Sequence, residues 1–220
     1  MRDILRRIFG APPPRKEVHL LGAGERDAIV ATHLRAALPP LGLTEVNARK
    51  WVDGAQPPVR RVFELQLLKS AMKACWGFSL DFVPHLSGGH VRWHRSDKTA
   101  LLDVIVDPRD LEQPSFLWGA AHLEEGLQRL LPEAVARAQE TWRRGSSFEG
   151  LIELIREIRD QHTNCFAYRN YTQLPLAYAM LCAKTGDLAT AEQELAAYAE
   201  GMEAGEAEKL KKLSRDCARA

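Results

Sequence analysis

The alternation of apolar and polar residues between positions 60 and 108 predicts an antiparallel sheet. Segments of this stretch show either the alternation of half-buried strands or the aliphatic run of a more central strand. They cover Phe63 to Leu67, Trp76 to Phe82, His90 to His94 and Thr99 to Val106, the last being the aliphatic one. Leu43 to Val52 is a further candidate strand. The short connections favour neighbouring antiparallel strands, because a parallel pair needs a long crossover.

One face of this sheet should be apolar and buried. Its expected members are Trp76, Phe78, Leu80, Phe82 and Trp93, with Leu101 or Leu102 beside them. Such a face needs a cover, because an apolar sheet surface is stable only when another layer packs on it. The helices of the second half either provide that cover or form a separate lobe, and the sequence leaves both arrangements open.

The opposite face of the sheet carries the candidate binding residues. Read in register, the predicted strands place these polar side chains there: Glu64, Gln66, Asp81, His90, Arg92 and His94. One interpretation is a surface for a ligand or a partner protein. The other is an ordinary solvated face, since antiparallel sheets often face water on one side.

Helical spacing of apolar residues precedes the sheet and continues throughout the chain after Pro108. The predicted helices are Glu25 to Leu38, His122 to Leu131, Pro132 to Arg144, Phe148 to His162, a hairpin near 174–199 and a fraying tail from Glu206 to Ala220. Pro132 is placed at a helix start, where its missing N–H costs nothing. Ser146 or Ser147 is a natural N-cap for the helix that follows.

These elements together predict an α+β fold. An N-terminal helix and an antiparallel sheet of about five strands are followed by an all-helical C-terminal half. The expected divisions are an amphipathic helix with a proline-rich spacer (1–16), an α+β antiparallel-sheet domain (17–110) and a helical domain ending in a helical hairpin (111–220).

Short phrases in the first half of the chain carry a resemblance. Residues 20–108 contain a helix ending in an LxxLGL-like phrase, a strand with Trp51, and the phrases FELQLLKS and WGFSLDFVP. In this order they resemble a bacterial family of small domains of unknown function, built as a helix followed by an antiparallel sheet. The resemblance implies an α+β fold and brings no catalytic residues. Some domains of this general kind occur beside bacterial toxins as immunity partners.

The hairpin near 174–199 resembles a single tetratricopeptide-type unit. Its turn glycine, Gly186, its small residue, Ala191, and its large apolar residue, Leu195, stand at the offsets of that repeat. Pro175 and Tyr198 depart from the pattern. Since a repeat array needs about three units to bury a continuous core, the resemblance implies a packed helical hairpin and no solenoid.

Composition narrows the partner classes. Apolar residues make up 45% and charged residues 27% of the chain, which is typical of a globular protein. A formal charge of +1 argues against a nucleic-acid partner. No apolar run is long enough to span a bilayer, although the basic amphipathic residues 1–9 allow weak contact with a membrane surface. The chain shows no secretory leader, and its four cysteines form no CxxC pair, so we expect a cytoplasmic protein.

The candidate chemistries are weak. His85, His90 and His94 are close in sequence, but the last two lie about 13 Å apart along one strand, too far to share a metal ion. No phosphate loop or nucleophile motif is present, and Cys75 beside Trp76 reads as a core residue. Glu64, Asp81 and Asp103 could meet on adjacent strands, which would raise one pKa and suit acid–base chemistry. The alternative is a set of ordinary exposed acids paired with Arg92 or Lys98. We therefore expect no metal and no cofactor, and the sequence leans away from an enzyme without deciding the question.

The sequence thus favours a cytoplasmic bacterial protein that binds another protein, for example as an immunity or accessory factor. The alternative is a small-molecule enzyme or sensor that uses the polar face of the sheet.

Overall fold

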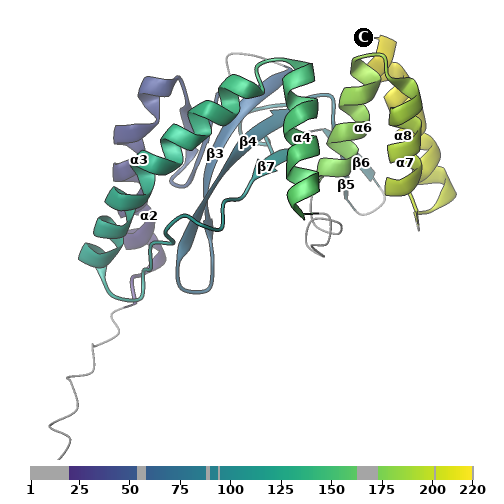
Figure 1. Cartoon of the computed structure of the whole chain (residues 1–220). Coiled ribbons are helices and arrows are strands. Elements are labelled where there is room, and N and C mark those ends of the chain that lie inside the picture. The colour runs from purple at the N-terminus through teal and green to yellow at the C-terminus, as the bar shows by residue number, and fades with distance from the viewer. Residues whose placement is uncertain are drawn as a thin grey trace, which may run out of the picture.

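The computed structural model describes residues 20–53, 58–87, 90–93, 95–162, 173–200 and 202–219, and the predicted N-terminal helix and spacer lie outside them. The predicted fold class is confirmed: a helix, a five-stranded antiparallel sheet and then further helices (Figure 1). The strands are β1 (Thr44–Asn47), β2 (Lys50–Val52), β3 (Val59–Leu67), β4 (Met72–Leu80), β5 (Pro84–Ser87), β6 (His90–Trp93) and β7 (Val104–Val106). The helices are α2 (Ala23–Ala37), η1 (Pro39–Leu41), α3 (Ala120–Arg144), α4 (Phe148–His162), α6 (Leu174–Lys184), α7 (Leu188–Tyr198) and α8 (Ala204–Arg219).

The pairing of β3 with β4 forms the centre of the sheet, whose strand order is β1-β2-β3-β4-β7. Phe63 lies opposite Trp76, and the two rings stack with centroids 6.3 Å apart. Trp76, Phe78 and Leu80 are each 1% exposed and belong to the main core, as the alternation predicts.

Helices α2 and α3 cover this apolar face, and α6, α7 and α8 gather at the other end of the molecule (Figure 1). Trp76 donates its indole N–H to the hydroxyl of Thr141 at 2.9 Å, and Trp142 donates to the carbonyl of Gly77 at 3.1 Å. One cluster of buried side chains extends from Leu21 to Cys217. The helical half therefore covers the sheet and continues its core.

The predicted meander is wrong after Leu80. β5 and β6 pair only with each other in a separate two-stranded sheet, so His90 to Trp93 does not extend the main sheet. As a result Phe82 and Trp93 are only half-buried, Phe82 against Phe148 and Trp93 beneath the guanidinium of Arg95. The turn after β4 redirects the chain, which alternation alone does not reveal.

The predicted strand from Thr99 to Val106 is also corrected. Only Val104–Val106 is a strand, and it lies at the edge of the sheet. Residues 95–103 instead form a strap across the second face, where Leu102 and Ala100 pack on Val52 and Val62. Leu102 is thus on the opposite face from Trp76. The predicted strand from Leu43 to Val52 likewise divides into β1 and β2.

Hydrogen bonds and ion pairs fasten the strap to the sheet. Arg60, buried on β3, contacts the carboxylates of Asp81 and Asp97 and donates to the carbonyl of Arg95 at 2.8 Å. Asp103 accepts from the backbone N–H of Leu80 at 2.7 Å and from the side chain of Ser79. Burial of Asp103 raises its pKa from 3.8 to about 7.

The helical predictions hold with one main correction. The two segments predicted on either side of Pro132 form one continuous helix, α3, of 25 residues. Pro132 and Gln128, whose carbonyl loses its usual partner, are both exposed residues, whereas Leu127 and Leu131 are buried. Packing on the sheet outweighs the single lost hydrogen bond.

The C-terminal helices form the predicted hairpin with an additional docked helix. Gly186 has a φ of +87° at the turn, and the carboxylate of Asp187 accepts the N–H of Thr190 as an N-cap. Ala191 and Leu195 are each 1% exposed. The tail helix α8, expected to fray, contributes Leu210 and Cys217 to the core.

Replacing Phe78 by alanine should lower the free energy of unfolding by about 3–5 kcal/mol, because its ring is buried and the α3–α4 turn packs on it. Urea denaturation measures the loss. Trp93→Ala, in the separate hairpin, is the control and should cost less than about 1 kcal/mol. Equal losses would contradict the assignment of Phe78 to the core.

The contribution of Asp103 to stability should fall as the pH rises from about 4 to about 7. The folded-state pKa of Asp103 lies above its ordinary value, so stability is fully present below about pH 4 for this group and is lost as the pH rises through about 7. The loss is at most about 4 kcal/mol, since a tenfold change in proton affinity is worth about 1.4 kcal/mol. Asp103→Asn should flatten the pH profile of urea denaturation, and an unchanged slope would refute this origin.

Candidate functional site

A cleft lies at one end of the sheet, beside the turn from α3 to α4. Its volume is about 850 Å³, within the range of about 300–1,000 Å³ typical of ligand sites. One wall is formed by β3, by η1 and by Asp53, the residue after β2, and the other by the end of α3 with the start of α4. The side chains used below are Asp53, Arg61, Phe78, Gln139, Trp142 and Arg143, with Ser146, Phe148, Glu149 and Leu151.

An arginine–aspartate pair lies on the strand wall of the cleft. Arg61 donates its Nε to the carboxylate of Asp53 at 2.8 Å, and its Nη2 lies 2.7 Å from the same carboxylate oxygen. The Nη2 also donates to the carbonyl of Leu41 at 3.0 Å. The guanidinium carbon lies 5.5 Å from the centre of the Trp142 ring, within reach of a cation–π interaction. These contacts fix the guanidinium group before any ligand arrives.

The helical wall depends on two glycines. A Cβ on Gly145 would lie 2.4 Å from the ring of Phe78, and one on Gly150 would lie 2.0 Å from the carbonyl oxygen of Arg144. The absence of side chains here lets the turn pack directly on β4 and lets α4 begin beside the end of α3. The hydroxyl of Ser147 accepts the N–H of Gly150 at 3.1 Å, which confirms the predicted N-cap.

The residues predicted to form a binding face are not gathered at this cleft. Glu64 and Gln66 are half-buried on the second face of the sheet, and Asp81 is paired with Arg60 beyond the end of β4. Arg92 is exposed on β6, in the separate hairpin. The side chain of His90 and the whole of His94 lie outside the described residues. The structure therefore divides this set between two sheets.

Cys75 lies across from Glu64 on the second face. Burial, with the carboxylate of Asp107 nearby, raises the pKa of the Cys75 thiol to about 12. A thiol with this pKa is protonated at neutral pH and is a poor nucleophile. Its expected position in the interior is confirmed, since the residue is fully buried.

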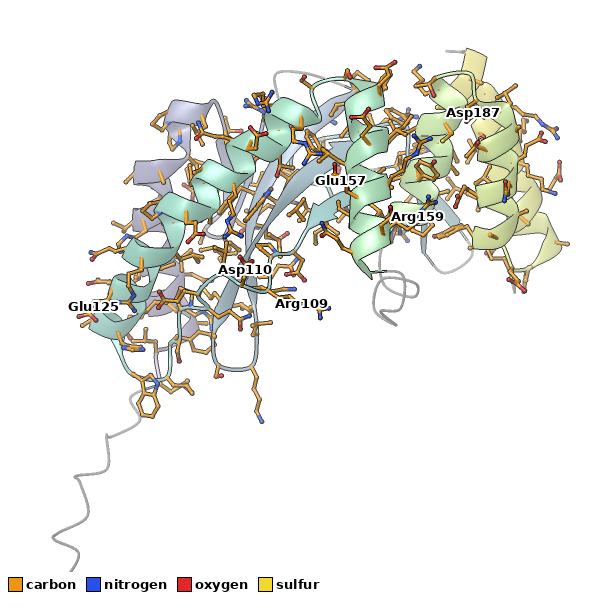
Figure 2. The ribbon with its side chains drawn as sticks, in the orientation of Figure 1. Arg109, Asp110, Glu125, Glu157, Arg159 and Asp187 are labelled. Carbon is orange, nitrogen blue, oxygen red and sulfur yellow. The ribbon has the colours of Figure 1, made fainter. Side chains whose placement is uncertain are left out.

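Contacts between α4 and the hairpin hold the helical wall in place. Arg159, labelled in Figure 2, reaches from α4 to the carboxylate of Glu194 on α7 at 3.0 Å. Arg156 donates to the hydroxyl of Tyr178 at 3.0 Å. The hairpin thus supports the helix whose first turn borders the cleft.

The described residues contain no group of three or more histidine, cysteine, aspartate or glutamate side chains placed to hold a metal ion. Across the same residues, no helix is both long and apolar enough to cross a membrane. Comparisons of the chain with protein-family models, with curated proteins and with solved structures found no match.

The sequence did contain a signal for the arginine–aspartate pair. Arg61 is in phase with Phe63 and Leu65, and Asp53 is in phase with Trp51, so both charges occupy positions where the alternation requires apolar residues. Charged side chains at core positions are uncommon and often mark functional sites. Reading the alternation only for its apolar members misses this signal.

Arg61→Gln should cost about 2–3 kcal/mol of stability, because it leaves the buried carboxylate of Asp53 without its cation. The double variant Asp53→Asn/Arg61→Gln should recover at least about 1 kcal/mol of that loss, since two neutral amides can hydrogen-bond to each other. Urea denaturation of the two proteins tests this sign reversal. Additive losses would show that the pair is not coupled.

Proposed function

We propose that this protein works by binding another protein and that a segment of that partner occupies the cleft between β3 and the α3–α4 turn. The observation that carries the proposal is the composition of the cleft: an accessible apolar lining that includes the half-buried ring of Phe148, beside a pre-positioned arginine, Arg61. Aromatic residues and arginine are enriched among the residues that dominate binding energy at protein interfaces.

The geometry favours binding over catalysis. Most charged groups at the cleft are engaged in structural pairs: Asp53 with Arg61, and Arg143 with Glu140 through hydrogen bonds of 2.8 and 2.6 Å, whereas Glu149 is exposed to solvent. General acid–base catalysis needs a titratable group within hydrogen-bond reach of the substrate and with a pKa near the working pH. Asp103, whose pKa is raised to about 7, is buried beneath the strap and does not line the cleft.

A cytoplasmic location forms part of the proposal. Cys75, Cys182 and Cys217 are free and buried, and burial raises the pKa of each thiol. Reduced, inert thiols are typical of proteins in a reducing compartment. An immunity or accessory role fits a protein that acts by occupying a partner, and identification of that partner would decide it.

Filling the cleft should abolish partner binding without unfolding the protein. Gln139 is exposed on α3 and lines the cleft, so Gln139→Trp places an indole inside it. Gln128→Trp is the matched control, because Gln128 is also an exposed glutamine of α3 and does not line the cleft. In affinity capture from the native cell, wild type and Gln128→Trp should recover the same partner, and Gln139→Trp should recover less than about a tenth as much.

Equal recovery by all three proteins would contradict the cleft as the binding site. Arg92→Glu belongs in the same experiment, because Arg92 is the described, exposed member of the predicted face on β6. Loss of the partner with Arg92→Glu, and not with Gln139→Trp, would move the site to the β5–β6 hairpin.

A further inference from the structure

The arginine–aspartate pair presents its cation to the cleft. The side chain of Arg61 is 33% exposed, whereas that of Asp53 is 5% exposed. Within the part of the chain that the structure describes, Arg61 makes its hydrogen bonds through Nε and Nη2 and none through Nη1. A group that enters the cleft therefore meets the guanidinium edge, with the carboxylate of Asp53 buried behind it.

The helical wall adds a second arginine to the cleft. Arg143 lines the cleft from the last turn of α3, and its ion pair with Glu140 is exposed, the two side chains being 72% and 55% accessible. Exposed ion pairs contribute little stability, so Arg143 can exchange Glu140 for another anion at small cost. The first turn of α4 also borders the cleft with the positive end of its dipole. Glu149 carries the opposite charge there and is exposed to solvent.

The floor of the cleft is apolar. Phe78, Trp142 and Leu151 lie beneath it and are almost fully buried, so its accessible apolar surface comes from half-buried residues, among them Leu41 and Val59. The half-buried ring of Phe148 completes the lining at the start of α4. An apolar floor beside a fixed cation is complementary to a ligand that carries a large apolar group next to an anion.

We propose, as an extension of the proposed function, that the partner segment carries an aspartate or glutamate adjacent to a large apolar residue. The carboxylate accepts hydrogen bonds from Arg61, and the apolar side chain packs on the accessible lining formed by Leu41, Val59 and Phe148. Hydrogen bonds between ionised partners are roughly twice as strong as neutral ones. The acidic residue therefore sets specificity, and the apolar residue contributes the buried area.

Selection of peptides on the full-length protein tests this directly. The probe is a phage library of random peptides of about 12 residues, panned on wild type after depletion on Gln139→Trp. The retained peptides should share an aspartate or glutamate within about two positions of a large apolar residue. Replacing that acid by its amide should weaken binding to wild type about 10-fold or more, as expected for a hydrogen bond to a charged group.

The neutral pair Asp53→Asn/Arg61→Gln is the matched receptor. On this variant the acid-to-amide change in the peptide should weaken binding by less than about 2-fold, because the cation that recognises the acid is gone. Gln128→Trp should bind the peptides as wild type does.

The outcomes separate the two proposals. Peptides that require an open cleft but show no acidic preference, or that lose equal affinity on both receptors, overturn the acidic motif and leave the proposed function standing. Recovery of no peptide that distinguishes wild type from Gln139→Trp contradicts the cleft itself, and with it both proposals.

Discussion

The docking of α3 on β4 is the constraint on which the rest of the structure depends. Two indole hydrogen bonds cross this contact in opposite directions, from Trp76 to Thr141 and from Trp142 to Gly77. A buried N–H that loses its partner costs about 1–3 kcal/mol, so a shift of α3 along the strand is penalised twice. Because the helix cannot slide, Gly145 comes to rest against Phe78 and α4 begins at the end of the sheet. The cleft is a consequence of this register.

The second face of β4 is closed by an equally tight contact. Gly77 has a φ of +151°, and a Cβ there would lie 1.8 Å from the carbonyl oxygen of Val104. This close approach lets β7 pair with β4 after the strap of residues 95–103 has crossed the sheet. β4 is therefore buried on both faces from Ala74 to Leu80. The solvated polar face that the alternation suggests exists only in part, since the strap covers the end that carries Arg60 and Ser79.

Local patterns predicted most of the fold and little of the site. The periodicity of apolar residues and the helix-capping residues predicted β3, β4, α2, α4 and the α6–α7 hairpin, because these elements bury residues that are close in sequence. The strap and the separate β5–β6 hairpin depend on contacts such as Arg60 with Asp97 and Gln173 with His85, between residues far apart in sequence, which no periodicity encodes. The continuity of α3 through Pro132 is likewise a tertiary effect. The cleft is formed by the residue after β2, by β3 and by the α3–α4 turn, which are far apart in sequence. The only sequence signal for it was the presence of two charged residues, Asp53 and Arg61, at positions where the alternation requires apolar ones.

The position of the Asp53–Arg61 pair is explained better by function than by stability. A buried or half-buried ion pair seldom stabilises a fold more than apolar side chains of similar volume, because desolvation offsets the attraction. Asp53 and Arg61 occupy neighbouring positions on the apolar face, between Trp51, Phe63 and Trp142, where apolar residues would serve the core at least as well. What the pair supplies is a guanidinium group held at a cleft by an aspartate, a carbonyl and an indole. Folding does not require such a group, whereas recognition of an anionic partner does.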